Sequence, residues 1–393
     1  MGGIFRLVGY FFERIHLMQI LRRLSSLLLG VSLATMVGVA TLTGSPLAQA
    51  KQVKVFLLMG QSNMFGLGHV VPPTSKITLS YAVQKDHLYP FLVNKSGSWA
   101  VFNNIRFVHV MPGRGNTPVK SKWDAFWKTH SVNGSIPKNM IRILYNQWLS
   151  VKGHRFIGPE FGIAHEIAKT VHGPILLLKS CIGNRSIGWD LLPPGSKNEF
   201  YTDKNGKVWE YAAYGQTPNK WIKGTPASER KPVRWYAGFE YDMDTKFAQY
   251  VLAHLDTFCP GATSYKIMGI FFWQGDKDRY DAGLATHYEK NLTAFIHAVR
   301  KTFGVPKAPF VQATLGQDIK GVTKGNDGLV LKGQLDVANP ALHPEFKGNV
   351  ATVYAHPLSL GGASNGHYNG NAQTYMNVGL AMGKAMNKLL ENK

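Results

Sequence analysis

Six short runs of apolar residues constrain the fold of this chain more than any other feature of the sequence. They are Val53 to Met59, Ile105 to Val110, Ile175 to Leu178, Ile267 to Trp273, Phe310 to Ala313 and Val350 to Tyr354. Runs that are apolar on successive residues suit strands buried on both faces, as in a parallel sheet. Helical spacing alternates with them in the segments Phe161 to Val171, Lys246 to Phe258, Tyr288 to Phe303 and Ala372 to Leu390. This alternation predicts a three-layer α/β/α sandwich around a mainly parallel sheet.

Two long segments interrupt the alternation, residues 116–154 and 196–234. Both are rich in Lys, Asn, Gly, Pro, Trp and Tyr, lack a clean period, and are too long to be simple connections. We expect them to be insertions that wall a cleft in a single domain of residues 51–393. Their aromatic side chains are candidates to stack on sugar rings, or else to pack the insertions onto the domain. These aromatic residues are Trp123, Trp127, Trp209, Trp221 and Trp235.

Residues 1–50 have the pattern of a secretory signal. The pair Arg22-Arg23 precedes an apolar run from Leu27 to Leu42, and Ala48-Gln49-Ala50 supplies the small residues of a cleavage site. An uncleaved membrane anchor is the alternative, but glycines and serines interrupt the run, which is short for a span. The sequence therefore predicts cleavage before Lys51 and a secreted or periplasmic protein without stable membrane insertion.

Basic residues exceed acidic residues along the whole chain. The sequence holds 44 Lys and Arg against 23 Asp and Glu, and without the first fifty residues 40 against 22 remain, a net charge of +18. This excess suits an acidic polymer as substrate, an anionic envelope, or only a solvated surface. Export and the lack of a DNA- or RNA-reading motif argue against nucleic acid. Candidates to hold acidic glycans in and beside the first insertion are Lys120, Lys122, Arg142, Lys152 and Arg155.

The segment from Val53 to Met64 carries the strongest chemical signal. An apolar strand ends there in Gly-Gln-Ser-Asn, which places Ser62 at the carboxyl edge of the sheet and at the start of a helix. Its hydroxyl is then exposed, and the free backbone N–H groups of a helix start can hold an oxyanion. The alternative is that Ser62 only caps the helix, which is a common use of serine.

Four short blocks occur in the order found in one known family. They are Gly60-Gln61-Ser62-Asn63-Met64, Lys179-Ser180-Cys181-Ile182-Gly183-Asn184-Arg185-Ser186, Trp273-Gln274-Gly275-Asp276-Lys277-Asp278 and Gly366-His367-Tyr368-Asn369. In this order and spacing they resemble the sialate O-acetylesterase and acetylxylan esterase group of SGNH hydrolases, carbohydrate esterase family six. The resemblance spans nearly all of residues 51–393 and implies an SGNH-hydrolase-like, flavodoxin-like fold. The first block is not the G-x-S-x-G elbow of ordinary α/β-hydrolases, because Met64 stands at the second glycine.

The resemblance implies a role for each matched position. Ser62 matches the nucleophile, and His367 matches the base that takes the serine proton. The backbone N–H groups of Ser62 and Gly183 and the side-chain amide of Gln274 match the donors of the oxyanion hole, where negative charge develops during acyl transfer. Residues of the same blocks that we expect to contact the substrate are Gln61, Asn63, Asn184 and Arg185.

Three positions depart from the family pattern. Asn184 replaces the second glycine of a Gly-Gly pair, and Asp276 replaces the glutamate of Gln-Gly-Glu. Ser364 stands where the family's acid commonly lies, three residues before the histidine, and a hydroxyl cannot carry the charge that stabilises an imidazolium. The expected substitute is Asp276, with Asp278 as its competitor, and an Asp276 oxygen should then lie about 2.6–3.2 Å from a nitrogen of His367. In the alternative, both aspartates only fix their loop and the site is a serine–histidine dyad.

These patterns predict a serine hydrolase that releases acetyl groups from a poly- or oligosaccharide or from sialic acid. No cofactor is needed, and no metal site is predicted because no Cys/His cluster has metal-ligand spacing. The alternative, prompted by Ser364, is a non-catalytic polysaccharide-binding protein on an esterase scaffold. A small ester or a cell-wall polymer is the alternative substrate. Cys181 and Cys259 can form one disulfide in an oxidising compartment or remain two buried thiols.

Overall fold

The predicted strands join one seven-stranded sheet in the computed structural model, which describes residues 51–117 and 119–392. From edge to edge the order is β12 (Val350–Val353), β11 (Phe310–Ala313), β10 (Ala262–Trp273), β1 (Lys51–Gly60), β6 (Ile175–Ser180), β3 (Phe102–Pro112) and β4 (Ile141–Leu149). All neighbouring strands are parallel except β3 and β4, which are antiparallel. The prediction of a mainly parallel sheet is therefore confirmed.

Five of these strands have the flavodoxin-like order. Taken along the chain, β1, β6, β10, β11 and β12 lie in the sheet as 2-1-3-4-5, and β3 and β4 extend the edge beyond β6. The direction of winding reverses between β1 and β10, so ligands are expected at the carboxyl ends of these two strands. Both strands end together, because Gly60 pairs with Trp273 in the register of the sheet.

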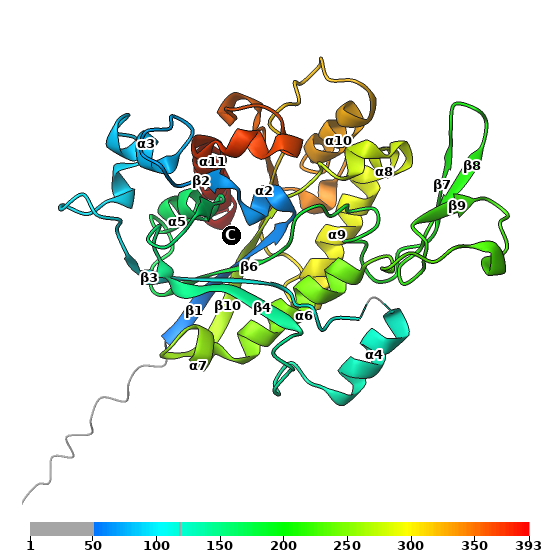
Figure 1. Ribbon diagram of the computed structural model, residues 1–393, viewed down its shortest axis with the longest axis horizontal. Coiled ribbons are helices and arrows are strands. Elements are labelled where there is room, and N and C mark those ends of the chain that lie inside the picture. The colour runs from blue at the N-terminus through cyan, green and yellow to red at the C-terminus, as the bar shows by residue number, and fades with distance from the viewer. Residues whose placement is uncertain (1–50, 118, 393) are drawn as a thin grey trace, which may run out of the picture. The chain divides into compact units, whose positions relative to one another are not determined.

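Alternate side chains of the central strands enter two separate apolar cores. In β1, Val55 and Leu57 belong to the core that also holds residues of α6 (Phe239–Ala253) and α9 (Tyr288–Thr302). Phe56 and Leu58 belong to the core that holds residues of α5 (Glu160–Ile167) and α11 (Ala372–Glu391). All four side chains are at most 1% exposed. Figure 1 shows these helices on the two faces of the sheet. This arrangement confirms the three-layer α/β/α sandwich.

The four predicted helices are present with somewhat different ends. They are α5 (Glu160–Ile167), α6 and α7 (Phe239–Ala253 and Leu255–Phe258), α9 (Tyr288–Thr302) and α11 (Ala372–Glu391). Asn371 begins α11, since its side chain accepts hydrogen bonds from the backbone of Gln373 and Thr374. The remaining helices of the described chain are α2 (Ser62–Phe65), α3 (Leu79–Gln84), α4 (Lys120–Thr129), α8 (Ala282–Thr286) and α10 (Gly325–Asp336).

The two expected insertions contain ordered elements. Residues 116–154 hold α4 and the edge strand β4, whose alternating exposure hides it from a search for continuous apolar runs. Residues 196–234 hold a separate antiparallel sheet of β7 (Glu199–Thr202), β8 (Val208–Tyr211) and β9 (Lys220–Ile222), seen at the right of Figure 1. A further two-stranded sheet joins β2 (Gly68–His69) to β5 (Phe156–Ile157). Trp123 and Trp221 are packing residues, with exposures of 2% and 5%.

The two cysteines are free thiols. Cys181 and Cys259 are both buried and unbridged, so the open question of a disulfide is decided in favour of two thiols. The predicted signal, residues 1–50, lies outside the described residues. Within the described ranges, no helix combines the length and the apolar character that crossing a membrane requires.

Candidate active site

Ser62 lies at the carboxyl edge of the sheet, as the sequence predicts. It is the first residue of α2 and follows β1 by one residue. The N-cap position is Gln61, so the alternative that Ser62 merely caps this helix is wrong. The turn needs glycine at position 60, where φ is 142° and a Cβ would lie 2.5 Å from the carbonyl oxygen of Trp273. As a first-turn residue, Ser62 has a backbone N–H without an intrahelical acceptor.

The turn after β6 brings Gly183 against Ser62. A Cβ built on Gly183 would lie 3.4 Å from the Cβ of Ser62. No backbone or side-chain acceptor in the described chain receives the Gly183 N–H. Asn184 has φ of 59°, and asparagine is one of the few residues besides glycine that adopts this left-handed region at low cost. The replacement of the family's second glycine by Asn184 therefore preserves the turn.

Hydrogen bonds between side chains and backbone lock together the three loops that follow β6, β1 and β10. Gln61 Oε1 accepts from Gln274 Nε2 at 3.1 Å and from the Lys277 N–H at 3.2 Å. Asp278 accepts from the Ile187 N–H at 2.9 Å. Burial raises the pKa of Asp278 to about 7, against the lowering effect of these N–H donors. Gln61 and Asp278 therefore act in the scaffold beneath the site.

The side-chain amide of Gln274, expected as the third oxyanion donor, already faces acceptors within the protein. Its Nε2 lies 2.9 Å from the carbonyl oxygen of Arg185 and 2.5 Å from Asp278, in addition to its bond with Gln61. An amide nitrogen has only two hydrogens, so these acceptors use its donors. Tyr288 donates to the amide oxygen of Gln274 at 3.0 Å and fixes the orientation of the side chain.

His367 lies on the turn η6 (Ser364–Gly370), directly before α11. His367, Tyr368 and Asn369 have φ values of 52°, 54° and 51°. This left-handed conformation costs a bulky residue such as Tyr368 about 1–2 kcal/mol. Tyr368 holds this turn in place, since it is fully buried and its ring stacks on Trp273 with 5.9 Å between centroids. Cα atoms of η6 approach those of α2 within 8 Å.

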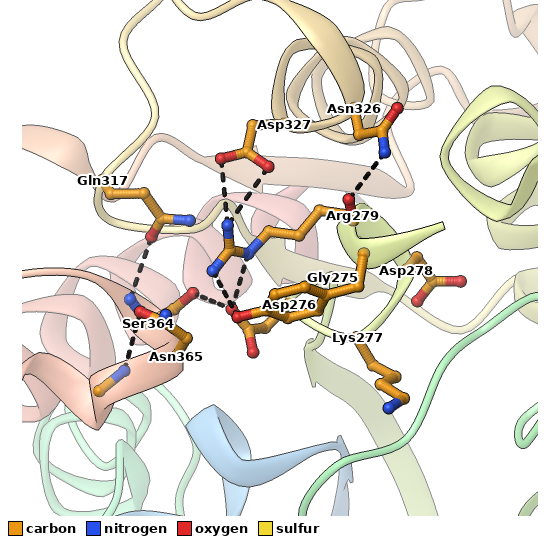
Figure 2. A network of polar contacts seen from close by, with 12 residues as sticks. Gly275, Asp276, Lys277, Asp278, Arg279, Gln317, Asn326, Asp327, Ser364 and Asn365 are labelled. Carbon is orange, nitrogen blue, oxygen red and sulfur yellow. Dashed lines mark hydrogen bonds and ion pairs between the residues drawn. The ribbon is translucent and has the colours of Figure 1, made fainter. Parts of the chain in front are cut away.

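The imidazole of His367 makes no hydrogen bond to Ser62 or to Asp276 among the bonds of residues 51–117 and 119–392. The expected bond between Asp276 and His367 is therefore absent. Asp276 Oδ1 instead accepts from Arg279 Nε at 2.9 Å and from Ser364 Oγ at 2.6 Å (Figure 2). Burial lowers the pKa of His367, and the negative charge of Asp276 raises it. The influence of Asp276 on the pKa of His367 is therefore electrostatic, without a hydrogen bond between them among the described residues.

Sequence reasoning missed the polar network around Asp276. Arg279 also binds Asp327, with 3.2 Å between Nη1 and Oδ2 (Figure 2). Asp318, on the loop after β11, is 1% exposed, and its carboxylate oxygens have no hydrogen-bond partner among the described residues. Burial raises the pKa of Asp318 to about 7, and the charge of Asp327 adds to this effect. In the sequence, only the polar residues that follow β11 could have indicated this network.

The remaining predicted substrate-binding residues have different surroundings. Asn184 is exposed beside Gly183, whereas Asn63 is fully buried, and its amide has no hydrogen-bond partner in the described chain. Arg185 Nε binds the buried carboxylate of Glu240 at 2.7 Å. This ion pair anchors the loop after β6 to the start of α6.

A buried ion pair supports α2 from below. Lys179 Nζ lies 2.6 Å from Glu160 Oε2 and donates to the carbonyl oxygen of Phe65, the last residue of α2, at 3.1 Å. Both charged side chains are at most 2% exposed. This contact joins β6, α5 and the helix that carries Ser62, so it fixes the position of Ser62 relative to the sheet.

Part of this chain matches a known protein family. Residues 251–388 match the family described as carbohydrate esterase, sialic acid-specific acetylesterase. This match assigns residues 251–388 to the sialate O-acetylesterase type of carbohydrate esterase. The matched residues are about a third of the chain and include Gln274, Asp276 and His367, whereas Ser62 and Gly183 lie before them.

Solved structures that resemble this chain are distant in sequence. A protein from Arabidopsis thaliana is 15% identical, with 85% of this chain and 98% of that chain covered and a TM-score of 0.44. A carbohydrate acetylesterase from Xanthomonas citri is 15% identical, with 86% of this chain and 57% of that chain covered and a TM-score of 0.45. NanS is 12% identical, with 78% of each chain covered and a TM-score of 0.34. A comparison with curated proteins finds no match.

Proposed function

We propose that this chain is an exported carbohydrate O-acetylesterase with Ser62 as its nucleophile and His367 as its base. The observation that carries the proposal is the contact of Ser62 with Gly183 at the point where the sheet reverses its winding. The backbone N–H groups of Ser62 and Gly183 have no acceptor among the described residues, and free N–H donors beside a serine hydroxyl are what acyl transfer requires. The family match supplies the ester chemistry.

The proposed reaction has two steps. Ser62 Oγ attacks the acetyl carbonyl carbon while His367 takes the hydroxyl proton, and the Ser62 and Gly183 N–H groups bind the oxyanion. The bond to the sugar oxygen breaks, and His367 returns the proton to that oxygen. Water, deprotonated by His367, then attacks the acetyl-enzyme and releases acetate and free Ser62. We assign Gln274 to holding the loops, because both of its amide hydrogens face protein acceptors.

Asp276 is the proposed acid of this site. Its carboxylate lies under Ser364, the position at which the family's acid commonly occurs, and its charge favours protonated His367. An acid that stabilises the imidazolium through space lowers the barrier at the step where His367 takes the proton. Asp278 is unsuited to this role, because its carboxylate faces the Ile187 and Gly188 N–H groups.

The decisive experiment is Ser62→Ala, assayed for acetate release from acetylated xylan, O-acetylated sialic acid and a generic acetyl ester. We expect turnover to fall by about 10⁴-fold or more, with the folded structure and sugar binding retained. Wild-type rates in this variant would refute the nucleophile assignment. A wild-type protein that binds polysaccharide without releasing acetate would instead favour the non-catalytic alternative.

Export is a separate part of the proposal. The predicted signal ends at Ala50, and we expect the N-terminal sequence of the secreted or periplasmic protein to begin at Lys51. An intact Met1 or Met18 on a cytosolic product would contradict it.

A further inference from the structure

We propose that a basic cleft beside Ser62 binds a glycan carrying several anionic groups, with carboxylates or sulfates on successive sugars. The cleft has a volume of about 660 Å³ and lies at the carboxyl ends of β3 and β6, against the start of β4 and α6. This volume lies within the usual range of ligand sites. The inference rests on the proposed function in one respect, namely that an acetylated sugar of the same glycan binds at Ser62.

Positive charge dominates the walls of the cleft. They carry five cationic side chains and one carboxylate, that of Glu240, which Arg185 already binds. The other four cations are exposed and have no carboxylate partner among residues 51–117 and 119–392. These four residues are Arg114, Lys138, Arg142 and Arg234. A single carboxylate would leave most of this charge unmatched, so the cleft suits a ligand with several negative groups.

The floor of the cleft is apolar and aromatic. Met111, Ile141 and Phe239 line it, and Trp235 stacks on Phe239 with 4.4 Å between ring centroids. An apolar platform surrounded by cations fits a sugar ring, which presents C–H faces to aromatic side chains, with its anionic substituents at the rim. Trp235, directly after residues 196–234, is therefore the candidate aromatic residue best placed to contact a sugar.

The cleft adjoins the turn whose Gly183 contacts Ser62. Ile182 and Arg185 line it, and Gly183 between them contacts Ser62. β6, β3 and β4 are the next three strands of the sheet from β1, so the β4 side of the cleft lies about 14 Å from β1 at the usual strand spacing. A glycan with one acetylated sugar at Ser62 would thus lay its neighbouring sugars in the basic cleft.

Binding to the Ser62→Ala protein tests this proposal without turnover. The probes are a galacturonic acid hexamer for carboxylates, a heparin-derived hexasaccharide for sulfates, neutral xylohexaose and monomeric sialic acid. We expect at least one of the anionic hexamers to bind about tenfold or more tightly than both the neutral hexamer and the monomer, and to weaken as salt rises. Whichever hexamer binds more tightly identifies the anionic group. Equal affinity for neutral and anionic hexamers, or for monomer and hexamers, would overturn the proposal.

Two triple variants in the Ser62→Ala background separate the cleft from the overall charge. Both remove three positive charges, and thermal unfolding verifies that each variant folds. Three surface contacts of typical strength predict about a tenfold loss of hexamer affinity in the cleft variant and less than about twofold in the control. An equal loss in both would show that only net charge attracts the glycan. The cleft variant is Arg114→Gln, Lys138→Gln and Arg142→Gln, and the control, on exposed lysines elsewhere, is Lys95→Gln, Lys301→Gln and Lys307→Gln.

The two proposals fail separately. If Ser62→Ala retains full esterase activity, the nucleophile is wrong but the cleft can still bind the anionic hexamers. If the hexamers do not bind, the acetylesterase assignment stands and the cleft does not recognise anionic glycans.

Discussion

Ser364 donates a hydrogen bond of 2.6 Å to Asp276, so the residue at the family's acid position contacts the carboxylate that we propose as the acid. The two residues come from different loops, after β10 and before α11, and Ser364 is fully buried. Because Asp276 also binds Arg279, two contacts fix the position of its carboxylate. The proposed acid is thus held by the residue that stands at the family's acid position in the sequence.

Asp276→Asn should lower kcat by about 10²- to 10⁴-fold with little change in KM, since the charge that stabilises the His367 imidazolium is lost. Ser364→Ala is the matched control, because it breaks the bond to Asp276 but keeps the carboxylate, and we expect less than about a tenfold loss. Steady-state kinetics on a generic acetyl ester measures both. Equal losses in the two variants would show that the hydrogen bond matters and the charge does not.

The pH profile should report the environment of His367. Burial lowers its pKa below the ordinary value of 6.5, while Asp276 opposes this shift. The unprotonated base therefore predominates above pH 6.5, and we expect kcat/KM to fall only at lower pH. Asp276→Asn removes the opposing charge and should move this acidic limb to still lower pH. A limb that stays in place or moves upward would contradict the coupling.

Gly183 offers a test of the oxyanion hole. Gly183→Ala keeps the N–H and adds a Cβ at 3.4 Å from the Cβ of Ser62, so a folded protein with a small loss of kcat is expected. Gly183→Pro removes the N–H, and kcat should fall by about 10²- to 10³-fold. Circular dichroism and thermal unfolding control for damage to the turn. Similar rates in the two folded variants would exclude Gly183 as a donor.

The buried carboxylate of Asp318 should make stability depend on pH. Its pKa of about 7 in the folded chain exceeds the ordinary value of 3.8, so between pH 4 and pH 7 the folded state holds a proton that the unfolded state has lost. The free energy of unfolding contributed by this group therefore falls as pH rises through this window. Asp318→Asn should stabilise the protein by about 1–3 kcal/mol at pH 8 and have little effect near pH 4. Urea unfolding at both pH values measures this, and equal effects at the two would contradict it.

The sequence predicted the central sheet and its helices because the pattern of apolar residues that indicates them is local in the chain. Continuous apolar runs such as Ile175 to Leu178 can be buried only between two layers, and each became a strand of the sheet. β4 was missed because an edge strand is exposed on one face and its residues alternate. α10 was missed because its apolar residues form no clear stripe.

Ser62, Gly183 and His367 could be found as candidates from short blocks of sequence, since each stands at a fixed offset from a strand or helix end. The residues that contact them could not be predicted from the sequence, because hydrogen bonds such as that from Ser364 to Asp276 join segments 88 residues apart. The roles of Gln61 and Gln274 likewise depend on which acceptors surround their amides, and that is fixed only when three loops meet above the sheet. The sequence alone therefore determined the layers and the strand ends that carry the candidate residues. The tertiary structure decided the hydrogen-bond partners, the burial that shifts each pKa and the basic cleft, because these depend on distances between elements remote in the chain.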